Sequence, residues 1–232
     1  MAFTQRLPND VLAVIADQVS SSIEDSGDAG GLPTAGPAQP SEPIPPPDAP
    51  PRRYSIGESF ELWTFARGMT KEYDAGNRDL STLVRRSGVW HHQLKVNESA
   101  EGFARSKPLG PTPESWSVRE IFWSPLAKSI DKAIDWIDEH VPDGVEARLL
   151  SAPFQQTEAF WFVTSPSSPL AEEWNDALFI VASSKHLEEL KPGAVVNSST
   201  FLKAMAGPKP IEGFNGKRKP AVNPIPGKKS SK

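Results

Sequence analysis

Two almost continuously apolar runs in the middle of the chain constrain its fold more than any other feature. They read TEAFWFVT and DALFIVAS, and they follow a shorter run, ARLLSAP; apart from the final Ser183, all three lie within the stretch from Ala147 to Ala182. The two long runs are rich in aromatic and β-branched residues, and Pro, Ser or Asp residues bound them. Short runs of this composition are typical of strands that are buried on both faces. We therefore predict that the three segments form the sheet of a single folded domain.

The rest of the chain divides by composition. A hydrophobic content of 38% is low for a wholly globular chain of 232 residues, and 24 Pro and 16 Gly are many. Nine of the prolines fall between Gly31 and Pro51, which is typical of an extended spacer. We predict a short amphipathic helix in residues 1–24, a proline-rich disordered linker in 25–53, an α+β domain in 54–206 and a basic disordered tail in 207–232.

Periodicity inside the predicted domain indicates further elements. An apolar face at helical spacing predicts a helix over residues 60–73. The alternating sequence VWHHQLKV predicts a hairpin of residues 89–96 and 102–107. Residues 116–123 fit either a first helical turn or a short strand, and the pattern does not separate the two.

The clearest helical pattern follows Pro125, where aliphatic residues at spacings of three and four predict a helix over 126–141. Shorter helices are expected over 185–190 and 199–206. Strands and helices do not alternate strictly, which argues against a doubly wound parallel sheet. We therefore predict a single α+β domain with a mostly antiparallel sheet of about five strands and one long amphipathic helix across a face, flanked by disordered ends. This order resembles that of small α+β modules of the profilin or roadblock type.

Residues 8–19 carry an apolar stripe at helical spacing. A helix of about three turns is marginal in isolation, so it must dock on its own domain or on a partner. The string RLPNDVLAVIADQV resembles the first helix of an F-box, a eukaryotic motif that binds subunits of ubiquitin ligases. The resemblance stops at Val19, because the following residues turn to Ser, Gly, Asp and Pro. The residues expected to contact a partner from this helix are Val11, Leu12, Ile15 and Val19.

Charge is distributed unevenly along the chain. The net charge is −4, but residues 208–232 carry seven Lys or Arg and one acid, which leaves 18 basic and 28 acidic residues in 1–207. An acidic body repels phosphates and argues against nucleic-acid binding except through the basic tail. The chain has no cysteine, no signal-peptide pattern and no apolar run long enough to cross a bilayer. We therefore expect a soluble protein inside the cell, in the cytoplasm or, in a eukaryote, also the nucleus, without membrane insertion.

The chain contains none of the short motifs that mark nucleophile elbows, phosphate loops, dinucleotide sites or zinc proteases. The adjacent His91 and His92 are the best candidates for chemistry. Neighbouring residues of a strand point to opposite faces, so the two imidazoles cannot bind one metal ion without a bulge. One of them could act as an acid or base in a cleft, with Arg105 on the return strand of the hairpin. The alternative is a pair of structural histidines, and we predict no cofactor and no metal.

Trp174 lies in a polar loop between two buried strands. Long loops concentrate binding residues, and an exposed tryptophan is a good interface anchor, although this one could instead fold back over the sheet edge. A short helix on a proline-rich tether, a compact domain and a basic tail together favour a non-enzymatic protein-interaction protein, an adaptor or accessory protein, with a protein partner. The alternative is a small enzyme of unknown reaction with a site around His91, His92 and Arg105. The oligomeric state stays open.

Overall fold

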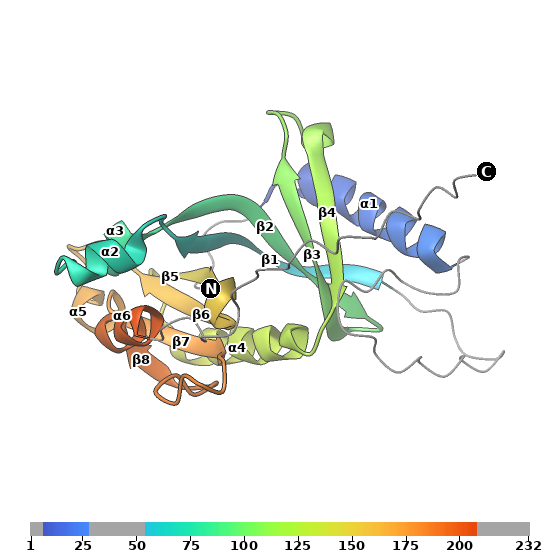
Figure 1. The fold of residues 1–232 in the computed structure, drawn as a ribbon. Coiled ribbons are helices and arrows are strands. Elements are labelled where there is room, and N and C mark those ends of the chain that lie inside the picture. Colours follow the sequence, from blue (N-terminus) through green and yellow to red (C-terminus); the bar gives the residue numbers. More distant parts are fainter. Residues whose placement is uncertain (1–6, 28–53, 208–232) are drawn as a thin grey trace, which may run out of the picture.

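The computed structural model describes residues 7–27 and 54–207, and their strands form one eight-stranded sheet (Figure 1). The strand order is β4-β3-β2-β1-β5-β6-β7-β8. All neighbours are antiparallel except β1 and β5, which run parallel. The prediction of an α+β fold with a mostly antiparallel sheet is confirmed, but about five strands was too few. The strands are β1 (Tyr54–Phe65), β2 (Val84–Val96), β3 (Ser99–Pro108), β4 (Trp116–Trp123), β5 (Glu146–Ala152), β6 (Thr157–Val163), β7 (Ala177–Ala182) and β8 (Val195–Asn197).

Helices cover both faces of this sheet. The long helix α4 packs on one face, while α2, α3 and α6 cover the opposite face of the β5–β8 half and α1 lies beside β4 at the other end of the sheet (Figure 1). The chain therefore has two long helices among its described residues, where we predicted one. The helices are α1 (Asn9–Gly27), α2 (Met69–Asp74), α3 (Leu80–Leu83), α4 (Leu126–His140), α5 (Ala171–Trp174) and α6 (Ser198–Ala206), with 3-10 turns η1 (Pro113–Ser115) and η2 (Pro153–Gln155).

The three apolar runs form β5, β6 and β7, as predicted, and they are buried on both faces. Successive residues of one strand belong to different cores. Leu149 lies in the core under α4, and the next residue, Leu150, lies in the core under α6. Because both faces are covered by helices, these strands show continuous apolar runs and no polar alternation.

The segment predicted as a helix over residues 60–73 is mostly strand. Residues up to Phe65 belong to β1, and only Met69–Asp74 is helical, after Gly68 in a left-handed conformation with φ of 90°. Phe60 and Leu62 are buried on the same face of β1, at the two-residue spacing of a strand. The helical pattern was wrong here because β1 has strand neighbours on both sides, β2 and β5, and their backbone pairing decides its conformation.

Some of the remaining predictions of helices and strands are confirmed, and others are wrong. The hairpin is confirmed as β2 and β3, the segment 116–123 is the strand β4, and the helices over 126–141 and 199–206 correspond to α4 and α6. The short helix over 185–190 was wrong, because these residues form successive turns, and another turn follows at Pro192-Gly193. The strand β8 had not been predicted. The predicted linker and basic tail lie almost wholly outside the described residues, although α1 extends beyond residue 24 to Gly27.

Candidate functional site

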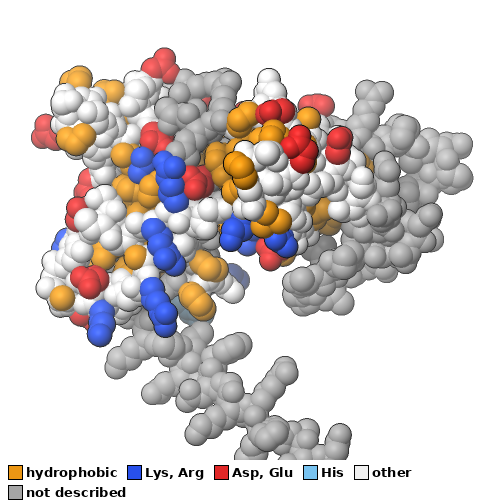
Figure 2. All heavy atoms as spheres, turned by 90° about the horizontal axis from the view of Figure 1, so that it is seen from above, with side chains coloured by type: hydrophobic (Ala, Val, Ile, Leu, Met, Phe, Trp, Pro, Cys, Tyr) orange, Lys and Arg blue, Asp and Glu red, His pale blue; other side chains and the backbone are white. Residues whose placement is uncertain are grey.

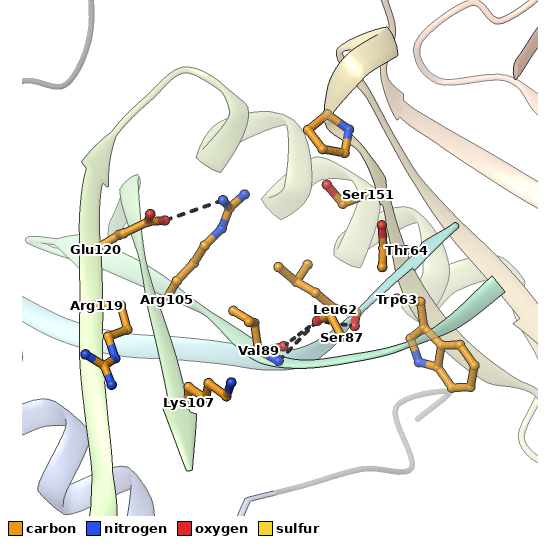
Figure 3. A pocket seen from close by; sticks show the side chains of 11 residues that line it. Leu62, Trp63, Thr64, Ser87, Val89, Arg105, Lys107, Arg119, Glu120 and Ser151 are labelled. Carbon is orange, nitrogen blue, oxygen red and sulfur yellow. Dashed lines mark hydrogen bonds and ion pairs between the residues drawn. The ribbon is translucent and has the colours of Figure 1, made fainter. Parts of the chain in front are cut away.

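A cleft of about 410 Å³ opens among the strands β1 to β5 (Figure 3). Arg105 extends into it from β3, Ser151 and Thr64 lie on the opposite side, and Leu62 and Val89 lie between them in this view. The wall therefore combines basic, hydroxyl and apolar side chains. The lining residues are Leu62, Trp63, Thr64, Ser87, Val89, Arg105, Lys107, Arg119, Glu120, Ser151 and Pro153.

Irregular strand pairing shapes the cleft. The register between β1 and β2 shifts after Glu61, and the Ser87 hydroxyl there donates a hydrogen bond of 2.7 Å to the carbonyl oxygen of Leu62. A second shift between β3 and β4 leaves Arg119 as an extra residue, because Arg105 pairs with Glu120 and Ser106 pairs with Val118. Bulges of this kind redirect side chains and are frequent beside binding sites.

Arg105 is the central basic group of the cleft. Its guanidinium lies over the rings of Phe103 and Phe122, 5.3 and 5.5 Å from their centres. Its Nη1 is 3.6 Å from Oε2 of Glu120, an ion pair at the cleft wall. Its Nε is buried and has no hydrogen-bond partner among the described residues. The aromatic rings thus hold a guanidinium in place whose hydrogen-bonding capacity is largely unused within this part of the chain.

Ser151 and Glu158 form a polar pair on the same face of the sheet. Ser151 faces Glu158 across the β5–β6 ladder, and its hydroxyl donates a hydrogen bond of 2.8 Å to Oε1 of Glu158. Burial raises the pKa of Glu158 to about 7, although the Ser151 hydrogen bond and the positive charge of Arg105 act to lower it. Its Oε2 is buried without a hydrogen-bond partner among residues 7–27 and 54–207. Sequence reasoning missed this pair, because its two members lie in runs that we interpreted only as buried strands.

The two histidines lie on opposite faces of β2, as adjacent strand residues must. His91 stacks on Phe103 at 4.4 Å between ring centres, and burial, with the charge of Arg105 and then His92, lowers its pKa to about 3. His92 contacts the hydroxyl of Ser59 through Nδ1 at 2.9 Å and that of Ser106 through Nε2 at 2.7 Å. Burial lowers the pKa of His92 to about 4. Both imidazoles are therefore neutral near pH 7, and neither lines the cleft; of the three predicted residues, only Arg105 does.

The stripe of α1 is docked on the chain's own sheet. Val11, Ile15 and Val19 are buried in a cluster with residues of β2, β3 and β4, whereas Leu12 is only partly buried. Gln18 adds a polar contact to the edge strand β4. Its Nε2 donates to the carbonyl oxygen of Trp116 at 2.8 Å, and its Oε1 accepts from the backbone N–H of Val118 at 2.9 Å.

Trp174 is buried, so of the two alternatives left open by the sequence the structure has the one in which this loop folds back onto the protein. It is 8% exposed and packs edge-on against Phe162 at 5.2 Å between ring centres, because the short helix α5 turns the loop back onto the core. Among the residues that the structure describes, the large exposed aromatic side chain is that of Phe154, 98% exposed in η2 beside the cleft residue Pro153. An aromatic residue between Pro and two Gln residues was the available sequence signal for this position.

Surface chemistry near these elements is mixed. On the face shown in Figure 2, several Lys and Arg side chains stand close to one another with hydrophobic side chains beside them.

The described part of the chain contains no group of three or more His, Cys, Asp or Glu side chains placed to hold a metal ion. Within the same ranges, no helix has both the length and the apolar composition needed to span a membrane.

Comparisons with known proteins identify no relative. No protein family, no curated protein and no solved structure matches this chain. Function must therefore be argued from the geometry alone.

Proposed function

We propose that this chain is a non-enzymatic protein-interaction protein, an adaptor or accessory protein, and that α1 and the strand beneath it form its docking element. The single observation that supports this proposal is the contact of Gln18 with β4. A side-chain amide pairs there with the backbone oxygen of Trp116 and the backbone N–H of Val118, the groups that a ninth strand would use. Edge strands left open recruit other strands, and covering them with a helix is a common protection.

The partner implied by this contact is an extended segment of another protein. Such a segment would replace α1, pair with β4 through main-chain hydrogen bonds and place apolar side chains against the tryptophans of this cluster. Three tryptophans are partly buried there, Trp90, Trp116 and Trp123. The ring centres of Trp90 and Trp116 are 6.1 Å apart. Since most of the stability of a helix in a protein comes from the packing of its apolar face, a partner that competes for the docking surface also releases the helix.

The test is a full-length variant in which α1 is released. Ile15 is completely buried, so Ile15→Asp places a charge in the apolar cluster, whereas Ala13→Asp adds the same charge on an exposed position of α1. We expect Ile15→Asp to gain binding to extended peptides selected from a display library, with hydrogen exchange of the α1 amides accelerated and the domain still folding cooperatively. Ala13→Asp should bind no more peptide than the parent chain. The proposal fails if Ile15→Asp folds and gains no peptide binding, or if peptide binding leaves the exchange of β4 amides unchanged.

A small enzyme is the second candidate, and the pair Ser151–Glu158 favours it. A carboxylate that accepts a hydrogen bond from a hydroxyl, with a pKa of about 7, is poised to take up the hydroxyl proton near neutral pH. Arg105 on the opposite wall could stabilise a negative charge. This candidate predicts that an activated ester is hydrolysed by the parent chain and that Ser151→Ala and Glu158→Gln both abolish the activity. Equal rates in all three proteins would exclude it.

A further inference from the structure

The charge distribution in the cleft is suited to an anion with one charged end. Arg105, Lys107 and Arg119 contribute three positive charges to the lining, and Glu120 contributes one negative charge. All four come from β3 and β4, on one side of the cleft. A ligand therefore meets a net positive wall on one side only.

The opposite part of the cleft is apolar and hydroxyl-bearing. Leu62 and Val89 line it together with Pro153, and Ser151 and Thr64 add hydroxyl groups. The cavity volume of about 410 Å³ lies in the range of small-molecule sites, and such sites combine an apolar surface with a few placed polar groups. A compact inorganic ion would leave this surface in contact with water, whereas an organic body would cover it.

Arg105 provides the anchoring group. A guanidinium presents its N–H donors in a planar fork that matches both oxygens of a carboxylate. Contacts with Phe103, Phe122 and Glu120 restrain this side chain, so little ordering remains to be done on binding. The ion pair with Glu120 spans 3.6 Å and involves Nη1 alone, so it leaves Nη2 available, whereas Nε is buried.

We propose that this cleft binds a small organic monocarboxylate, with its carboxylate paired to Arg105 and its apolar body against Leu62 and Val89. The site shares strand β4 with the edge that α1 covers, but its anchoring residue Arg105 lies on β3, so the proposal does not depend on the docking role of α1. No covalent step is involved.

Two carboxyl groups interact with the charge of Arg105, and when ionised they weaken the binding of a carboxylate ligand. Glu120 from β4 is paired with it, and Glu158 from β6 interacts with its charge through the protein interior. His91 from β2 is neutral near pH 7, while Lys107 and Arg119 favour the ligand. As the pH rises through about 7, Glu158 ionises and its negative charge competes with the bound carboxylate. Binding should therefore weaken between pH 6 and pH 8.

The experiment uses the full chain and three probes: hexanoate, its uncharged analogue hexanamide, and inorganic phosphate. Binding is measured by isothermal titration calorimetry and by amide chemical shifts at pH 6 and pH 8. We expect hexanoate to bind with shifts centred on β1 and β3, hexanamide and phosphate to bind at least tenfold more weakly, and hexanoate affinity to fall at pH 8. Lys107→Gln should weaken hexanoate several-fold, whereas Lys132→Gln, on the exposed side of α4, should leave it unchanged.

Arg105→Lys tests the fork itself, because it keeps the charge and removes the planar donor pair. At least a tenfold loss of hexanoate affinity is expected, with an unchanged unfolding midpoint. If Arg105→Lys does not fold, Lys107→Gln and the hexanamide comparison decide the question. Equal binding of hexanoate and hexanamide, stronger binding of phosphate, or no binding of hexanoate to the parent chain would each overturn the proposal.

Discussion

Replacement of Glu158 by glutamine should change how the stability of this protein depends on pH. Burial raises the pKa of Glu158 to about 7 from an ordinary value of 4.5. The folded state therefore holds a proton that the unfolded state releases, and the stability linked to it is fully present below pH 4.5 and is lost as the pH rises to about 7. Because each pKa unit corresponds to about 1.4 kcal/mol, the ionised carboxylate costs the folded state about 3 kcal/mol.

Glutamine has nearly the same shape and does not ionise. It keeps an oxygen that can accept the hydrogen bond from Ser151, but its amide group occupies the place of the unpartnered Oε2, at a cost of about 1 kcal/mol. This cost is the same at every pH. The free energy of unfolding of Glu158→Gln, relative to the parent, should therefore increase by about 2–3 kcal/mol between pH 5 and pH 8.

The assay is urea unfolding followed by tryptophan fluorescence at the two pH values. Glu188→Gln, a change at an exposed glutamate, is the matched control. Its free energy of unfolding should change between the two pH values by the same amount as that of the parent. Titration of other groups affects all three proteins alike and cancels in the difference. If the Glu158→Gln and parent curves keep the same separation at pH 5 and pH 8, the buried ionisation that underlies this reasoning is refuted.

Three further predictions concern other residues. Burial holds the pKa of His91 at about 3 and that of His92 at about 4, below the ordinary 6.5. The stability linked to these two groups is therefore present above pH 6.5 and is lost as the pH falls towards 3. His91→Phe should reduce this acid sensitivity, measured as the urea midpoint at pH 4.5 relative to pH 7. Phe154→Ser should leave the thermal midpoint within about 1 °C of the parent, because the side chain is 98% exposed; a larger decrease would show that η2 packs against the domain. Gln18→Ala should speed hydrogen exchange at Val118 by roughly fivefold, because about 1 kcal/mol of edge hydrogen bonding is lost, and unchanged exchange would contradict the edge-covering role of this residue.

The local sequence pattern was sufficient to predict those helices and strands whose buried residues recur at a regular spacing. The runs of β5, β6 and β7, the hairpin of β2 and β3, and the helix α4 could all be predicted, because each shows its period within a single window. Of the candidate site, only Arg105 could be named in advance. The other cleft residues are ordinary strand and turn residues that carry no motif.

Tertiary structure decided what depends on distant partners. Strand β1 has an apolar spacing that also fits a helix, and its pairing with β2 and the parallel β5 selected the strand. Trp174 is buried and Phe154 is exposed because a short helical turn directs each loop towards the core or away from it. Amino-acid composition does not encode this direction. The cleft itself joins residues from β1 to β5 that are far apart in the chain. Most of the buried segments could be recognised from the amino-acid sequence, because hydrophobicity and periodicity are local properties. Which buried segments meet, and what lies between them, was decided by non-local pairing energies that no single window contains.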